Sequence, residues 1–162
     1  MAPDRQFKVR KVLSGSYLGK VIVNSTTDHF LLGGGNPDDL PLENSSLIKS
    51  GKSSCSALVE MLGPRREGNS EKVFVKKFFF KGIVHSLKPL IRQHRAQVMW
   101  KVSWHLLEHS IPVPEPQGYL IKQRGPFCLR GYFFARVLPK CSSLEELAKD
   151  LSQFSKRFDS GG

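Results

Sequence analysis

Alternating prolines divide this chain more sharply than any other local signal. Residues 111–116 read Ile-Pro-Val-Pro-Glu-Pro, and this stretch must be extended because proline fixes φ, lacks an amide hydrogen and restricts the residue before it. The segment before it carries two apolar stripes at helical spacing: Ile91, Val98, Val102 and Leu106, and Trp100, Trp104 and Leu107. We therefore expect one long helix over 89–109, with Pro89 in its first turn and a strand after the prolines.

Strand-like segments surround the predicted helix. Residues 7–23 mix β-branched and aromatic residues around a Gly-Ser turn and predict a hairpin. Further strands are predicted as a meander and as a pair around a turn at 123–126: 47–49, 55–62 and 73–80, then 118–122 and 127–138. A second, amphipathic helix is expected over 142–154. This order predicts an α+β domain built on an antiparallel sheet.

Three consecutive glycines, Gly33-Gly34-Gly35, resemble a phosphate-binding loop at first sight. They precede Asn-Pro-Asp-Asp rather than a helix. A phosphate loop needs a helix directly after its glycines, because the helix N-terminus supplies part of the anion site. We therefore interpret residues 33–35 as a turn.

Basic residues dominate the charge of the chain. Lysine and arginine outnumber aspartate and glutamate by 25 to 14, which gives a formal net charge of +11. Such an excess favours anionic partners, namely nucleotide phosphates, nucleic acid or an acidic membrane surface, and charge alone leaves all three open. With 40% hydrophobic residues over 162 positions, one folded domain is expected.

The cysteines and the apolar segments bear on location. Cys55, Cys128 and Cys141 are far apart and form no Cys-x-x-Cys pair, which argues against a structural zinc site and favours a reducing cytosol. The N-terminus has no long apolar run, and no window approaches the length of a membrane-spanning helix. We expect a cytoplasmic protein whose contact with the inner membrane, if any, is peripheral.

The sharpest local signal for chemistry is Val73-Phe74-Val75-Lys76. In a strand, Val73 and Val75 share one face, and Phe74 and Lys76 share the other. Kinases use a lysine on such a strand because a rigidly held ammonium can bind the α- and β-phosphates of ATP. A lysine near a strand end is more often simply solvated, so the tetrapeptide alone leaves both interpretations open.

Residues 95–116 carry a more specific pattern. It consists of an arginine, a tryptophan five residues on, a Leu-Leu pair and an Ile-Pro-x-Pro turn: Arg95, Trp100, Leu106-Leu107 and Ser110–Pro114. This pattern resembles the lipopolysaccharide kinase (Kdo/WaaP, InaA-like) family, and the resemblance continues over about residues 46–150. It implies a protein-kinase-like N-terminal lobe, with an antiparallel sheet of about five strands and one long helix, preceded here by extra N-terminal strands.

The resemblance also implies an organisation and a nucleotide site. Residues 1–46 would hold the N-terminal strands and a Gly/Pro loop, 47–139 the lobe, and 140–162 the helix after the hinge. ATP would be the ligand, with Lys76 on its α- and β-phosphates. A turn is expected to lie over the phosphates: Ser50, Gly51, Lys52 and Ser53. The backbone of a hinge is expected to contact adenine: Arg136, Val137 and Leu138. A plain solvated hairpin is an equally open interpretation of the turn.

Arg95 departs from the usual arrangement of such a site. A carboxylate on the helix normally orients the lysine, but there is no acid between Arg92 and Leu107. Arg95 lies on the stripe expected to face inward, and an inward-facing arginine requires an anion. Two partners stay open: a protein carboxylate, Glu60 or Glu115, or a phosphate of the nucleotide.

The function implied by the resemblance is incomplete in this chain. No His-x-Asp run with a following Asn and no Asp-Phe-Gly run is present to supply a base and hold Mg²⁺. We therefore expect a truncated or split N-lobe of an ATP phosphotransferase for a lipopolysaccharide core sugar or related glycolipid, which needs a separate C-lobe chain and Mg²⁺. Two alternatives stay open: a non-catalytic kinase-like regulator, and a basic module for acidic lipid or, less in keeping with the sequence, nucleic acid stacked on Phe78-Phe79-Phe80.

Overall fold

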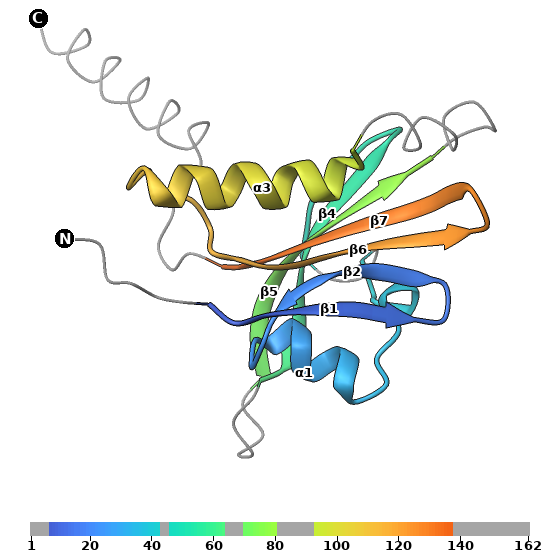
Figure 1. Ribbon diagram of the computed structural model, residues 1–162, viewed down its shortest axis with the longest axis horizontal. Helices are drawn as coiled ribbons and strands as arrows, with labels where there is room; N and C mark the ends of the chain where they lie inside the picture. The colour runs from blue at the N-terminus through green and yellow to red at the C-terminus, as the bar shows by residue number, and fades with distance from the viewer. Residues whose placement is uncertain (1–6, 43–45, 64–69, 81–92, 138–162) are drawn as a thin grey trace, which may run out of the picture.

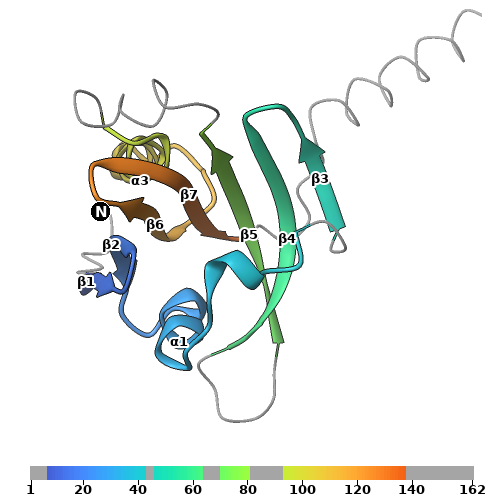
Figure 2. The ribbon, with the colours of Figure 1, turned by 90° about the vertical axis from the view of Figure 1, so that its right-hand side faces the viewer.

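The structure, a computed structural model, describes residues 7–42, 46–63, 70–80 and 93–137. Its main element is one antiparallel sheet of seven strands. The strand order is β1-β2-β6-β7-β5-β4-β3 (Figures 1 and 2). The strands are β1 (Val9–Ser14), β2 (Tyr17–Ile22), β3 (Ser46–Ser50), β4 (Ser54–Leu62), β5 (Ser70–Phe79), β6 (Pro116–Arg124) and β7 (Phe127–Arg136). The helices are α1 (Thr26–Leu32), the 3-10 turn η1 (Pro37–Asp39) and α3 (Arg95–Glu108). The predicted α+β class and antiparallel sheet are confirmed.

Every strand predicted from the sequence is present, and most extend further than expected. The hairpin β1-β2 turns at Gly15, whose φ is 56°. The meander β3-β4-β5 and the pair β6-β7 also form as predicted. The hairpin joins the rest through β2, whose residues 17–21 pair with residues 118–122 of β6. The chain before residue 46 and the chain after it therefore share one sheet.

No sequence pattern indicated the short helix α1. Its N-cap is Ser25, whose side chain accepts a hydrogen bond from the Asp28 amide at 3.1 Å. Gly33 caps its other end and Gly34 adopts a φ of 81°, so the prediction of a turn at 33–35 is confirmed. Thr27 Oγ1 donates to Gln117 Oε1 at 2.8 Å and ties α1 to β6.

The long helix is shorter than predicted and is rotated about its axis. The sequence predicted residues 89–109, but residues 93 and 94 are not helical, and His94 is the N-cap, accepting from the Ala96 amide at 3.0 Å. Pro89 and Ile91 lie outside the described residues. Val98 and Val102, expected to face inward, are 41% and 49% exposed. The second stripe faces the sheet instead, because Trp100 packs on Tyr119, with ring centroids 5.8 Å apart.

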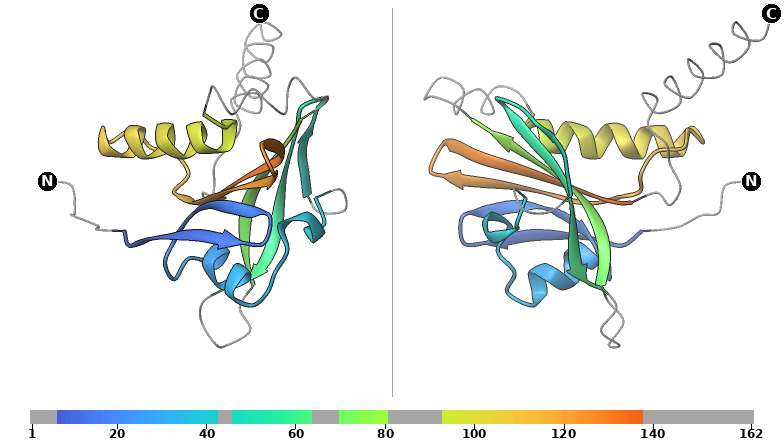
Figure 3. Two further views of the ribbon diagram at one scale, coloured as in Figure 1. Left: turned by 45° about the vertical axis from the view of Figure 1, so that its right-hand side comes forward. Right: turned by 180° about the vertical axis from the view of Figure 1, so that it is seen from behind.

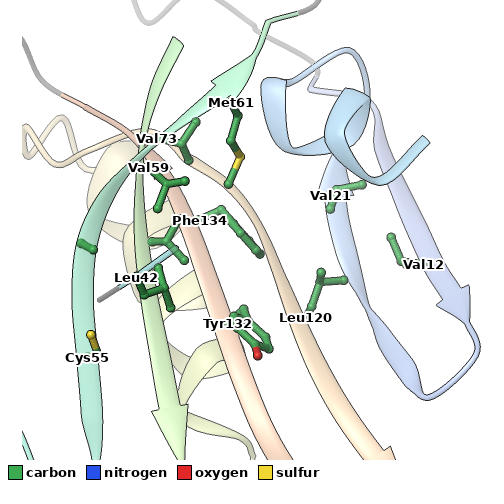
Figure 4. Packing of buried hydrophobic residues seen from close by; sticks show 12 residues of the cluster. Val12, Val21, Leu42, Cys55, Val59, Met61, Val73, Leu120, Tyr132 and Phe134 are labelled. Carbon is green, nitrogen blue, oxygen red and sulfur yellow. The ribbon is translucent and has the colours of Figure 1, made fainter. Parts of the chain in front are cut away.

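Two apolar layers cover the two faces of the sheet. The segment from α1 to Leu42 covers one face, and α3 covers the β6-β7 part of the other (Figure 3). The layer under α1 is shown in Figure 4: Val12, Val21, Leu42, Cys55, Ala57, Val59, Met61, Val73, Val75, Leu120, Tyr132 and Phe134. Each large buried side chain stabilises the fold by about 1.5–3 kcal/mol, so these layers hold the sheet rigid around its central strands.

Candidate functional site

Lys76 projects from β5, near the middle of the sheet between β4 and β7. Val73 and Val75 are fully buried on the α1 side, so Phe74, Lys76 and Phe78 lie on the α3 side and the predicted alternation is confirmed. The Lys76 side chain is half-buried, and its Nζ lies 5.6 Å from the centroid of the Phe78 ring. Among the described residues, no carboxylate forms an ion pair with Lys76.

The α3 side of strands β3, β4 and β5 is called the Lys76 face below. In Figure 2, α3 lies beside β6 and β7, whereas β4 and β3 extend away from the helix. Directly opposed residues of an antiparallel pair share a face. Ser56, Leu58 and Glu60 lie opposite Lys76, Phe74 and Lys72 respectively. The Lys76 face therefore combines a half-buried apolar floor, made by Leu58 and Phe74, with the ammonium groups of Lys72 and Lys76.

The predicted turn 50–53 meets both β5 and α3. Ser53 accepts a hydrogen bond from the Phe79 amide through its carbonyl oxygen at 3.0 Å, and the Gly51 amide donates to the Ser54 carbonyl at 2.9 Å. Arg95 Nη1 lies 3.5 Å from Ser53 Oγ, at the helix end nearest the tip of β4 (Figure 1). The turn, the last residues of β5 and the first residue of α3 are thus in one place.

Arg95 does not face inward as expected. Its residue is exposed, and its described partner is the Ser53 hydroxyl rather than a carboxylate. Glu115, one of the two predicted carboxylates, instead accepts from Arg136 Nη1 at 3.2 Å. The reason is the rotation of α3: the bulk of Trp100 defines the buried side of the helix, and Arg95 is therefore turned toward the edge of the Lys76 face.

The predicted hinge lies at the other end of the same strand. Arg136 is opposite Val73, three residues before Lys76, whereas Ser53 bonds to Phe79, three residues after it. At about 3.3 Å per residue, each lies roughly 10 Å from Lys76 along β5. The Arg136 amide already donates to the Glu115 carbonyl at 2.9 Å, so it is not free for a base. Val137 is half-buried, and Leu138 lies outside the described residues.

Two cavities lie near α1, away from the turn and from Lys76. One, of about 690 Å³, is lined by residues of 29–41 and 59–63, among them His29 and Asp39. The other, of about 480 Å³, has two cations, but Arg10 is paired with Asp28 and Lys122 with Asp38. Neither cavity therefore offers unpaired cations to a phosphate, and the Lys76 face is the better candidate.

A half-buried carboxylate that the sequence did not reveal, Asp38, joins η1 to the sheet. Asp38 accepts hydrogen bonds from Lys122, from Tyr132 and, at 2.6 Å, from Arg130. Burial alone would raise the pKa of Asp38, but the hydrogen bonds from Lys122, Tyr132 and Arg130 hold it well below its usual range. Burial and the same carboxylate raise the pKa of Tyr132. The cluster is saturated with partners, so we assign it a structural role.

His94 is a buried polar group that the sequence did not reveal. It is 3% exposed and lies beside the rings of Phe78 and Phe80, with centroids 6.3 and 5.0 Å away. It also lies directly over Gly131, where an added Cβ would be 1.8 Å from His94 Cε1. Burial, helped by the charge of Arg95, lowers the pKa of His94 to about 4. Its Nε2 has no hydrogen-bond partner among the described residues. Because its pKa is lowered, the ring is neutral at pH 7.

Acid is expected to destabilise the protein through His94. Its pKa is lower in the folded state than the value of about 6.5 in an unfolded chain. The unfolded state therefore binds the proton first, and stability falls as the pH drops from about 6.5 to about 4. The loss is about 3 kcal/mol in total, measured by urea denaturation across this range. His94→Asn keeps an N-cap acceptor and should flatten this part of the profile. Equal slopes in the variant and the unmodified protein would refute the assignment.

Neither the described residues nor a comparison with known proteins identifies a ligand of this chain. No group of three or more metal-ligating side chains is found among the described residues. Within the same part of the chain, no helix is both long and apolar enough to cross a membrane. No protein-family model, curated protein or solved structure matches this chain.

Proposed function

We propose that this chain is a nucleotide-binding lobe whose Lys76 holds the phosphates of ATP. The observation that carries the proposal is the position of Lys76: midway along a central strand, unpaired among the described carboxylates, with the turn 50–53 at one end and the Arg136 end of β7 at the other. An ammonium on a rigid strand loses little freedom on binding an anion, and no carboxylate of the described residues compensates its charge.

The Lys76 face supports the rest of the nucleotide as well. Phe74 and Leu58 offer a half-buried apolar floor on the Arg136 side of Lys76, which suits a purine ring. Gly51 and Ser53 offer a small turn on the other side, which suits phosphate oxygens. Arg95, held near Ser53 Oγ, adds a second cation at that end. The base end and the phosphate end are therefore distinguishable.

The reaction we propose is transfer of the ATP γ-phosphoryl group to a hydroxyl of a lipopolysaccharide core sugar or a related glycolipid. This substrate class rests on the family resemblance of residues 46–150. The attacking hydroxyl would lose its proton to a base, and the γ-phosphorus would exchange the ADP oxygen for the sugar oxygen. The base and the carboxylates that hold Mg²⁺ would come from a C-lobe. The net charge of +11 suits an anionic glycolipid at a membrane surface.

Lys76→Ala tests the proposal against a matched neighbour. Isothermal titration of the full chain with ATP should give binding that Lys76→Ala weakens by roughly 100-fold, as expected for the loss of a charge-assisted contact of about 3 kcal/mol. Lys77→Ala removes the same charge from the opposite face of the same strand, where its Nζ lies over the Tyr132 ring, and should change the affinity less than threefold. Equal losses in the two variants, or no binding by the unmodified chain, would reject the proposal.

The aromatic run Phe78-Phe79-Phe80, which was the main argument for nucleic-acid binding, packs within the fold. Phe78 is 4% exposed and belongs to the layer under α3, and Phe79 and Phe80 pack against the two layers. Base stacking needs exposed ring faces. If the basic surface nevertheless bound nucleic acid, affinity would fall steeply with salt and would depend little on Lys76 alone.

A further inference from the structure

The Lys76 face continues past β4 to the edge strand β3, where Lys49 extends it. Lys49 lies opposite Ser56 of β4, and Ser56 lies opposite Lys76 of β5. The alternate residues of β4, Cys55 and Ala57, belong to the layer under α1. Ser56 and both of its cross-strand neighbours therefore lie on the same face. Lys49, Ser56 and Lys76 form one row across three strands.

A β-bulge puts Lys49 on this face. The β3-β4 register shifts between Leu47, which is opposite Ala57, and Lys49, which is opposite Ser56. In an uninterrupted register Ile48 would oppose Ser56, and Lys49 would oppose Cys55 on the buried side. The extra residue therefore turns Lys49 toward Lys76, and leaves Ile48 56% exposed. Bulges that redirect a side chain in this way are common next to functional sites.

The spacing of the two lysines suits adjacent phosphoryl groups. Neighbouring strands are about 4.8 Å apart, so the backbones at Lys49 and Lys76 are roughly 10 Å apart. The side chain between them is only a serine, which allows the two flexible stems to converge. Among the described residues, neither ammonium has an ion pair with a carboxylate. Two such cations repel each other, and an anion bridging them relieves that repulsion.

We propose that Lys49 and Lys76 together form a clamp for two linked phosphoryl groups, which makes the site selective for nucleoside di- and triphosphates over monophosphates. The proposal rests on the proposed function, since it assigns Lys49 to the same nucleotide site. Lys76 holds the phosphate nearer the base end, and Lys49, from the edge strand, holds the outer phosphate. A monophosphate reaches Lys76 alone. Lys49 is thus the residue that distinguishes nucleotides with two or three phosphates from those with one.

Titration of the full chain with AMP, ADP and ATP tests the clamp in Lys49→Gln. The variant should bind ADP and ATP with roughly 10-fold lower affinity, because one charge-assisted contact is lost. Its affinity for AMP should stay within about twofold of that of the unmodified chain. Lys20→Gln, an equal charge change at an exposed site on β2, should leave all three affinities unchanged. Lys49→Arg should retain most of the preference for two phosphates, because it keeps the cation.

The possible results separate this inference from the proposed function. An unmodified chain that binds no nucleotide rejects both. Binding that needs Lys76 but is unchanged in Lys49→Gln rejects only the clamp, as does an equal loss for AMP and ATP, which would indicate a general effect of charge. The clamp is supported if Lys49→Gln loses affinity for ADP and ATP but not for AMP, and Lys20→Gln loses none.

Discussion

Replacing Asp38 with alanine is expected to destabilise the protein by about 3 kcal/mol. The carboxylate accepts from Lys122, Arg130 and Tyr132, which belong to two central strands, and its own side chain is only 12% exposed. Its removal leaves two cations and a buried hydroxyl without their shared acceptor. Breaking a fully buried pair costs about 3–5 kcal/mol, and the lower figure applies here because Lys122 and Arg130 still reach water.

Urea denaturation of Asp38→Ala and Asp39→Ala measures this effect with a neighbouring control. Asp39 is exposed and accepts one side-chain hydrogen bond, from Asn36 Nδ2 at 3.0 Å. Its removal should cost less than 1 kcal/mol, in the range of ordinary surface substitutions. If the two variants lost the same stability, the role of Asp38 in joining η1 to the sheet would be wrong.

Gly131→Ala is expected to displace His94 and to loosen α3 from the sheet. The new Cβ would lie 1.8 Å from His94 Cε1, a distance at which no side chain can stay. The imidazole would have to leave its site beside Phe78, and its acceptor for the Ala96 amide would be lost with it. Loss of the N-cap lowers the free energy of unfolding by about 1 kcal/mol. Repacking of the apolar layer under α3 lowers it by about 1–3 kcal/mol more.

A double-mutant cycle identifies the cause of that loss. His94→Ser keeps an N-cap acceptor but removes the ring that overlaps the added methyl group. Gly131→Ala should then cost far less in the His94→Ser background than in the unmodified chain, with a coupling of at least 1 kcal/mol by denaturation. An undiminished cost of Gly131→Ala would mean that the strand itself, rather than His94, requires the glycine.

Local patterns in the sequence were sufficient for the strands and for the direction of Lys76. Side chains alternate strictly along a strand, so it follows from their spacing that Val73 and Val75 share one face and Lys76 lies on the other. The prolines likewise end the helix and open β6, which begins at Pro116. These features depend on a few neighbouring residues, which is why they could be predicted.

Features that depend on contacts between distant elements were not predicted. Histidine is an unusual N-cap, so nothing before Arg95 marked the start of α3, and the two apolar stripes could not be ranked without knowing that Trp100 meets Tyr119. Asp38 collects partners from residues 84 to 94 positions away. The bulge at Ile48 changes the face of Lys49 without any glycine or proline to indicate it.

The positions of the candidate site residues were predicted in part. The sequence singled out Lys76, Arg95 and the turn 50–53, and the structure brings Arg95 and Ser53 together near the end of the strand that carries Lys76. Of the two partners left open for Arg95, a carboxylate is not found among the described residues, because the rotation of α3 turns Arg95 to the edge of the sheet. A non-catalytic regulator would use the same face, so nucleotide binding itself is the property to be measured first.

Chemical labelling of lysines with an acyl phosphate of ATP tests the central claim most directly. A lysine near the phosphates attacks the acyl carbonyl, the bond from that carbon to the phosphate oxygen breaks, ATP departs, and an amide remains on Nζ for mass spectrometry to locate. We predict that Lys76 is labelled, that excess ATP suppresses the label, and that Lys77, on the other face of β5, is not labelled. Equal labelling of Lys76 and Lys77, or labelling of Lys76 that excess ATP does not reduce, would contradict the assignment of this face as a nucleotide site.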